Sequence, residues 1–210
     1  MEPKTSVWDS TLAEFDEQIA QTNGITGAVS VAAISGALAI HVLRMVLEVA
    51  AKRKGSEADR PRIQELLDAA REEWARLQRF ADADRAAYAH YVDAVRLPRS
   101  NEEERGQRTR AMRTALRSAT ETPLGAARAA VAAIDLCLEA APFARGEIMA
   151  DVGGAACLLS GAVHCMLLSV DANLKGVEDE KFAAEVGVER RALEEHAKQR
   201  TQMVRQRLAL

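Results

Sequence analysis

Two aspartates stand in apolar surroundings where a carboxyl group could exchange protons with a substrate. Asp151 opens a long run of Ala, Gly, Cys and Leu, and Asp84 falls on the apolar line of a helical pattern, between Trp74 and Tyr88. Burial disfavours the charged form of a carboxyl group and raises its pKa, which suits it to act as an acid or a base. The alternatives are a helix cap for Asp151 and a surface position beside the apolar line for Asp84.

Histidine and cysteine give weaker indications of chemistry. His41 and His164 fall in two almost uncharged stretches, where a hydrogen-bonded core histidine is the commoner outcome. The four histidines are too scattered for a recognisable metal site, and the GxGxxG, P-loop, HExxH and GxSxG motifs are absent. The three cysteines form no CxxC pair, and their odd number does not describe a disulfide framework. We therefore expect no metal and a reducing, cytoplasmic compartment; the polar, mixed-charge start of the chain predicts no export signal.

The helices that must hold these groups include two nearly uncharged segments. Residues 25–43 contain no Asp, Glu, Lys or Arg, and residues 148–170 contain only Asp151 of those types. Both approach membrane-spanning length, but they consist of small residues, include histidines and lack a flanking Trp or Tyr belt. We interpret them as buried helices of a bundle that has no membrane partner, and a two-span membrane protein is the alternative.

The spacing of apolar residues in the rest of the chain also indicates helices. Apolar residues recur three and four positions apart, no segment alternates with period two, and only 8 aromatic residues occur in 210. A helix is expected from a cap at Ser6 or Asp9 to about Thr22, followed by a break at Asn23 and Gly24. Further helices are expected at about 26–52, 57–95, 102–120, 124–140, 148–174 and 178–206, with Pro123 opening a helix of its own.

These observations predict an all-α fold. The expected architecture is one domain over residues 1–210, a bundle of six or seven helices in which two are buried and rich in small residues. Small residues let helices approach closely, which suits a tight core or a dimer interface. With 28 Lys plus Arg against 31 Asp plus Glu the net charge is −3, so a nucleic-acid partner is not expected.

The order of several short motifs resembles that of the cyclodeaminase/cyclohydrolase family. This family comprises the cyclodeaminase domain of formiminotransferase-cyclodeaminase and the methenyltetrahydrofolate cyclohydrolases of one-carbon metabolism. The resemblance covers nearly the whole chain. The motifs are the small-residue run 27–37, Lys52 at the end of that helix, Asp84-Arg85-Ala86-Ala87-Tyr88, Leu97-Pro98, Ala119-Thr120 with Pro123-Leu124, Ala150-Asp151-Val152-Gly153-Gly154-Ala155, and Asn173-Leu174-Lys175-Gly176.

The resemblance implies a tetrahydrofolate derivative as substrate, no covalently bound cofactor, and a homodimer. It implies Asp151 as the acid or base, and Asp84 as its catalytic partner or as a ligand of the pterin amide edge. Lys52 would meet the anionic glutamate tail; its alternative is to offset the helix dipole at the end of its helix. The substrate-binding positions implied are Lys52, Gly27, Ser30 and Asn173.

Three departures from the family pattern bear on the activity. The family opens its second helix with Pro-Gly-Gly-Gly-Ser, where this chain has Thr26-Gly27-Ala28-Val29-Ser30. The branched side chain of Val29 is expected to narrow the ligand cleft. Polar neighbours that the family places before Asp151 are missing, and Ser169 replaces an expected asparagine.

Three functions follow from the resemblance and its departures. The first is a methenyltetrahydrofolate cyclohydrolase, which the lack of a formiminotransferase domain on this chain favours. The second is a formiminotetrahydrofolate cyclodeaminase, which acts at the same carbon. The third is a non-catalytic or repurposed helical relative, which the lost glycines favour.

Overall fold

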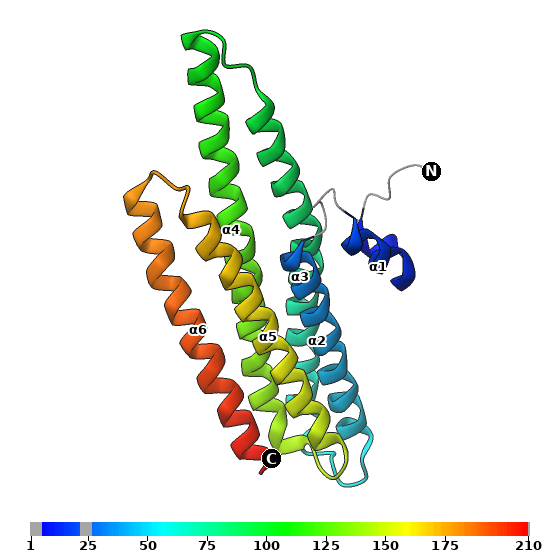
Figure 1. Ribbon diagram of the computed structural model, residues 1–210. Helices are drawn as coiled ribbons and strands as arrows, with labels where there is room; N and C mark the ends of the chain where they lie inside the picture. The colour runs from blue at the N-terminus through cyan, green and yellow to red at the C-terminus, as the bar shows by residue number, and fades with distance from the viewer. Residues whose placement is uncertain (1–5, 22–26, 210) are drawn as a thin grey trace.

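The computed structural model describes residues 6–21 and 27–209, and the regular elements of these ranges are all helical. This confirms the predicted all-α class and the expected number of helices (Figure 1). The elements are η1 (Val7–Asp9), α1 (Leu12–Ala20), α2 (Ala28–Lys52), α3 (Arg60–Arg96), α4 (Glu102–Ala140), η2 (Ala141–Phe143), α5 (Ile148–Leu174) and α6 (Glu180–Leu208). The predicted break at Asn23 and Gly24 lies outside the described residues.

Four helices form the body of the bundle. α2 packs on α3 and α5, and α4 packs on the same two helices, so the four close a ring; α6 lies outside against α4 and α5. At about 1.5 Å per residue, α3 and α4 reach roughly 55–60 Å, against roughly 38–40 Å for α2 and α5. The α3–α4 hairpin therefore projects beyond the other helices (Figure 1).

The close approach of these helices depends on small residues. Ala33, Ala37 and Ala39 of α2 are fully buried, as are Ala155 and Ala156 of α5. A Cβ atom placed on Gly36 would lie 3.0 Å from Leu77, 3.6 Å from Leu159 and 3.8 Å from Ala162. Larger side chains would force α2, α3 and α5 apart, so this composition fixes their spacing.

The predicted boundary between helices at 120–124 is wrong. α4 runs unbroken from Glu102 to Ala140, with Pro123 buried inside it. Proline removes one backbone donor, so the carbonyl four residues earlier, that of Ala119, loses its helical partner. A side chain from another helix replaces the lost donor, as described below, and the helix continues.

The N-terminal helix is shorter than predicted and mostly exposed. Thr11 caps α1 in a capping box with Glu14, and Ser6 caps the preceding η1. Of its three large apolar side chains, only Phe15 is buried; Leu12 is 82% exposed and Ile19 is exposed. The reason is that α1 lies beside the bundle and follows η1, which is attached to α3: Asp82 accepts hydrogen bonds from the Ser6 hydroxyl at 2.6 Å and the Val7 N–H at 2.8 Å.

The two small-residue helices are central but not enclosed on every side. Both are long and apolar enough to cross a membrane, yet about half of each is buried within the protein. Each helix also has an open face, and large apolar side chains are exposed along it: Leu38, Met45 and Val49 of α2, and Leu158 and Leu168 of α5.

The two histidines expected in the core lie instead on exposed positions of these helices. His41 packs beside Trp74, with 5.1 Å between ring centroids, and His164 Nδ1 lies 2.7 Å from the Ser160 carbonyl. Partial burial of its ring, and then the charge of Arg44, lower the pKa of His41. Helical periodicity left their orientation open because the apolar pattern surrounds both helices.

Glycine at position 125 is required for the contact of α3 with α4. A Cβ atom there would lie 2.6 Å and 2.8 Å from atoms of the Phe80 ring, so Gly125→Ala is expected to lower the free energy of unfolding by about 1–3 kcal/mol. Gly106→Ala, in the same helix, would meet only the end of the Arg110 side chain at 3.6 Å and is expected to stabilise by about 0.5–1 kcal/mol. Urea unfolding of both variants measures this difference, and equal effects would contradict the packing argument.

Candidate functional site

A buried hydroxyl on α2 holds a carboxyl group on α3. Ser30 is fully buried, and its hydroxyl lies 3.1 Å from Asp84 Oδ2 and 3.0 Å from the Ala81 carbonyl oxygen, both acceptors for its proton. The small residues around Ser30 let α2 approach α3 closely enough for this contact. The predicted site residues Ser30 and Asp84 therefore lie together, and Asp84 is a half-buried residue of the site rather than a member of the solvated surface.

Burial raises the pKa of the Asp84 carboxyl, and its hydrogen bonds with Ser30 offset part of that rise. The Asp84 carboxylate also affects the neighbouring Cys165 of α5. Burial, and then the charge of Asp84, raise the pKa of the Cys165 thiol. The Cys165 thiol donates to the Ala28 carbonyl at 3.4 Å, across the seam between α5 and α2. A carboxyl group with a raised pKa can accept a proton from water or return one to a leaving group near neutral pH.

The Asp84 side chain borders a cavity of about 270 Å³ between α3, α4 and the end of α5. Asn173, a predicted substrate-binding residue, lines the same cavity, as does Tyr88. The remaining lining residues are Ala87, Tyr91, Leu116, Ala119, Ala172 and Gly176. The walls are thus mostly apolar, with a few polar groups, which is the usual composition of a small-molecule site.

The wall formed by α4 and α5 depends on the proline inside α4. Pro123 leaves the Ala119 carbonyl without a backbone donor, and the Asn173 side-chain amide donates to that carbonyl at 2.7 Å. This bond ties the end of α5 to the middle of α4 beside the cavity. The bond also explains why three of the family-like motifs occur together, since Ala119, Pro123 and Asn173 all take part in this one contact.

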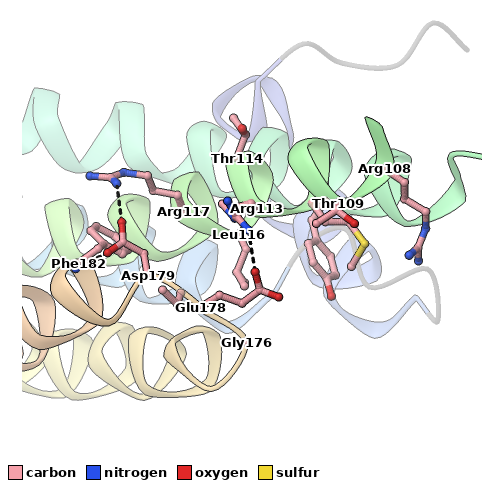
Figure 2. Close-up of a pocket in the computed structure, with 13 residues that line it drawn as sticks. Arg108, Thr109, Arg113, Thr114, Leu116, Arg117, Gly176, Glu178, Asp179 and Phe182 are labelled. Carbon is pink, nitrogen blue, oxygen red and sulfur yellow. Dashed lines mark hydrogen bonds and ion pairs between the residues drawn. The ribbon is translucent and has the colours of Figure 1, made fainter. Parts of the chain in front are cut away.

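A second cavity, of about 470 Å³, adjoins the first and shares Tyr91, Leu116 and Gly176 with it. Three arginines of α4 line it: Arg108, Arg113 and Arg117. Figure 2 shows Arg113 paired with Glu178, at 2.9 Å, and Arg117 directed toward Asp179, at 3.8 Å. The Arg117 guanidinium also lies 4.2 Å from the centre of the Phe182 ring.

The start of α2 does not narrow the cavity, although the loss of the family's glycines predicted that Val29 would do so. Gly27 is the N-cap of α2 with φ of −101°, and a Cβ atom there would meet nothing within 4 Å. Val29 is buried in the hydrophobic core and is not among the residues that line the Asp84 cavity. In this structure its side chain therefore does not narrow that cavity.

The other two predicted site residues lie toward the opposite end of the bundle. Lys52 is the last residue of α2; its side chain is 81% exposed and lies 4.0 Å from Glu48. Asp151 is half-buried in the first turn of α5, where Glu147 and not Asp151 is the N-cap. Within one copy of the chain, neither residue meets Asp84, and their predicted roles stay predictions.

The arginine-lined cavity and the role of Pro123 were not predicted from the sequence. The available signal for the cavity was the spacing of Arg113 and Arg117, one helical turn apart, ahead of the acidic pair 178–179. The signal for Pro123 was an internal proline in an otherwise uninterrupted helical pattern. Within the ranges 6–21 and 27–209, no group of three or more His, Cys, Asp and Glu side chains is placed to hold a metal ion.

Known proteins resemble this chain over most of its length. The sequence model of the family described as formiminotransferase-cyclodeaminase matches residues 11–192. The formimidoyltransferase-cyclodeaminase of Sus scrofa is 28% identical over 206 residues, which cover 98% of this chain. The chain spans only 38% of that relative's length.

Two further relatives are matched over most of their own length. A methenyltetrahydrofolate cyclohydrolase of Methylorubrum extorquens is 28% identical over 180 residues, covering 84% of this chain and 85% of that protein. The crystal structure of a formiminotetrahydrofolate cyclodeaminase from Thermotoga maritima superposes with a TM-score of 0.86 and 25% identity. That superposition covers 97% of this chain and 98% of the other.

The bond between Asn173 and Ala119 can be tested by supplying the missing backbone donor. Asn173→Ala is expected to cost about 1–3 kcal/mol of unfolding free energy, because the Ala119 carbonyl loses its donor. In a Pro123→Ala background, residue 123 regains an N–H for that carbonyl, so the same substitution should cost at least ~1 kcal/mol less. A double-mutant cycle by urea unfolding measures the coupling, and additive effects would contradict it.

The raised pKa of Asp84 predicts that its ionised form weakens the fold. Stability associated with this group is complete below its unfolded pKa and is lost as pH rises through the higher folded pKa. Asp84→Asn should therefore raise the Tm at pH 7, and the gain should disappear below about pH 4, near the unfolded pKa. Asp93→Asn, an exposed position on the same helix, is the control and should leave the Tm nearly unchanged. A lower Tm for Asp84→Asn at pH 7 would contradict the prediction.

Proposed function

We propose, because this chain belongs to the formiminotransferase-cyclodeaminase family, that it hydrolyses the methenyl bridge of a 5,10-methenyltetrahydrofolate. One observation carries the proposal: the Asp84 carboxyl, held by Ser30 and raised in pKa by burial, faces a mostly apolar cavity. The substrate is a folate-type small molecule whose bridging carbon is an electrophilic, amidine-like centre. No covalently bound cofactor is needed for this reaction.

Asp84 is the proposed base in this reaction. The carboxylate accepts a proton from a water molecule as the water oxygen bonds to the bridging carbon, and one C–N bond of the bridge then breaks. The proton passes from Asp84 to the departing ring nitrogen, so the carboxylate is restored, and the remaining hydroxyl proton is released to solvent as the formyl C=O bond forms. The Ser30 hydroxyl orients Asp84 and lowers its pKa, which keeps the group ionised over a wider pH range than burial alone would allow.

The two adjoining cavities suggest how a folate would lie. The ring system would occupy the smaller cavity with Asn173 and Tyr88. The anionic tail would extend into the arginine-lined cavity and replace Glu178 and Asp179 as the partners of Arg113 and Arg117. Planar guanidinium groups suit carboxylates because they bind both oxygens at once. We therefore propose the arginines for the tail-binding role that the resemblance implies for Lys52.

A cyclodeaminase is the second candidate, and the raised pKa of Asp84 favours it. Release of ammonia from a formimino group requires an acid, and a buried carboxyl retains its proton to a higher pH than an exposed one. The Thermotoga maritima relative is named for this reaction, and the Methylorubrum extorquens relative for hydrolysis.

We also propose a homodimer in the cytoplasm. The support for the dimer is the open apolar face of α2 and α5, which a second copy of the chain would cover. The support for the cytoplasm is the cysteine pattern, since Cys137, Cys157 and Cys165 are all free thiols.

The activity assay compares two substrates with purified protein. Loss of methenyltetrahydrofolate absorbance above the buffer rate is expected, and Asp84→Asn should reduce kcat at least 100-fold. The acid limb of the wild-type pH profile should lie above the usual range of an aspartate because the pKa of Asp84 is raised. Asp93→Asn is the matched control and should retain full activity.

Each alternative has its own outcome in this assay. Ammonia release from formiminotetrahydrofolate, without hydrolysis of the methenyl compound, would replace the cyclohydrolase by a cyclodeaminase. No turnover of either substrate would reject both enzymes and favour a repurposed relative.

A further inference from the structure

A cavity of about 490 Å³ lies in the groove between α5 and α6, which run side by side (Figure 1). It shares no lining residue with the two cavities of the candidate site. The residues that line it are all polar and none is acidic: Ser160 and His164 of α5, and Lys198, Thr201, Arg205 and two glutamines of α6. We propose that this groove binds the phosphate groups of a small organic phosphate.

The two permanent cations of the groove have no carboxylate partner. Within the ranges 6–21 and 27–209, neither Lys198 nor Arg205 forms an ion pair. Arg200, on the same helix, differs because Asp135 holds its guanidinium at 2.9 Å. An unpaired cation that lines a cavity favours an anion there, since the anion supplies the missing charge-assisted hydrogen bonds.

The polar positions of α6 form one continuous face. Residues 198, 201, 202 and 205 are three and four positions apart, so their side chains emerge in a row roughly 10 Å long. The long side chains of Lys198 and Arg205 can converge on one ligand between them. A phosphate dianion or a diphosphate carries enough charge for both cations, whereas a single carboxylate would leave one of them unpaired.

The helix dipole explains only part of this charge pattern. α6 ends at Leu208, and Arg205 and Arg207 in its last turn offset the negative end of its dipole. Lys198 lies about 15 Å before that end, and the effect of the dipole falls off within one turn. Residues 196–210 contain no Asp or Glu at all. The unpaired charge of Lys198 therefore needs another explanation, and an anion in the groove supplies one.

A hydroxyl group between the two cations also lacks a partner. Thr201 Oγ1 is buried and makes no hydrogen bond. Thr120 and Thr122 of α4 differ, because each donates to the carbonyl four residues earlier, at 2.8 Å and 2.9 Å. A buried polar group without a partner costs free energy. Rotation about the Cα–Cβ bond of Thr201 would direct its hydroxyl into the groove, where a phosphate oxygen would accept its proton.

Titration calorimetry with inorganic pyrophosphate, at an ionic strength held constant with potassium chloride, tests the proposal without an enzyme assay. Saturable binding at one site per chain is expected. Lys198→Gln and Arg205→Gln should each weaken that binding at least ~10-fold, because each removes charge-assisted hydrogen bonds. The control is Lys181→Gln with Arg191→Gln, which removes two exposed cations of the same helix outside the groove and should leave the affinity unchanged.

Thr201→Val separates a binding role of the hydroxyl from a structural one. Valine has a similar shape and lacks the unpaired buried group, so the Tm without ligand should stay the same or rise. The affinity for pyrophosphate should fall about 2–10-fold, as expected for the loss of one hydrogen bond. A lower Tm with an unchanged affinity would assign the hydroxyl to the fold and contradict the site.

Other results of the titration would overturn the proposal. They are the absence of saturable binding, or full binding by the double variant Lys198→Gln, Arg205→Gln. Loss of binding in Arg113→Gln alone would place the anion in the arginine-lined cavity instead. Equal affinity for succinate would reject phosphate as the ligand group. Sedimentation with phosphatidic acid vesicles that depends on Lys198 would identify a lipid phosphate and reject the small molecule. None of these results bears on hydrolysis of the folate, which is assayed separately.

Chemical protection locates the site without a variant. Limited acetylation by acetic anhydride, followed by mass spectrometry, should modify Lys198 more slowly when pyrophosphate is present. Lys181, exposed at the other end of α6, should be modified at the same rate with and without it. Protection of neither lysine, or of both equally, would overturn the assignment of the anion to this groove.

Discussion

The close approach of α2 to its neighbours is the constraint on which the site depends. Alanine, glycine and serine on the inner faces of α2 and α5 leave no room for larger side chains, as the crowded position of Gly36 shows. Only at such a distance can a serine hydroxyl, one of the shortest polar side chains, reach a carboxyl group on the next helix. The polar contact between Ser30 and Asp84 is therefore a consequence of helix packing.

The same packing sets the electrostatics of the site. Helices that lie this close exclude water, so the Asp84 carboxyl is partly desolvated and its pKa rises. The fold therefore carries the free-energy cost of a partly buried carboxyl group at this position. A second contact between helices depends on Pro123. The proline leaves the Ala119 carbonyl of α4 without a backbone donor, and the Asn173 side chain of α5 donates a hydrogen bond to it.

The helices that build the site also carry the open apolar face. In a single copy this face exposes several large apolar side chains along two long helices. A ring of four helices buries the inner side of α2 and α5, and α6 covers part of α5 and leaves α2 open. The proposed homodimer would cover this apolar face.

The sequence by itself determined the all-α class, most helix boundaries and the family-like motif that contains Asp84. These depend on local periodicity, caps and motif order, which a linear pattern records. Only the tertiary structure decided that α4 passes through Pro123, that His41 and His164 face outward, and that Asp151 and Lys52 lie far from Asp84. Each of these depends on which helices are neighbours and which faces they cover, and contacts between residues distant in the chain leave no periodic signal in the sequence.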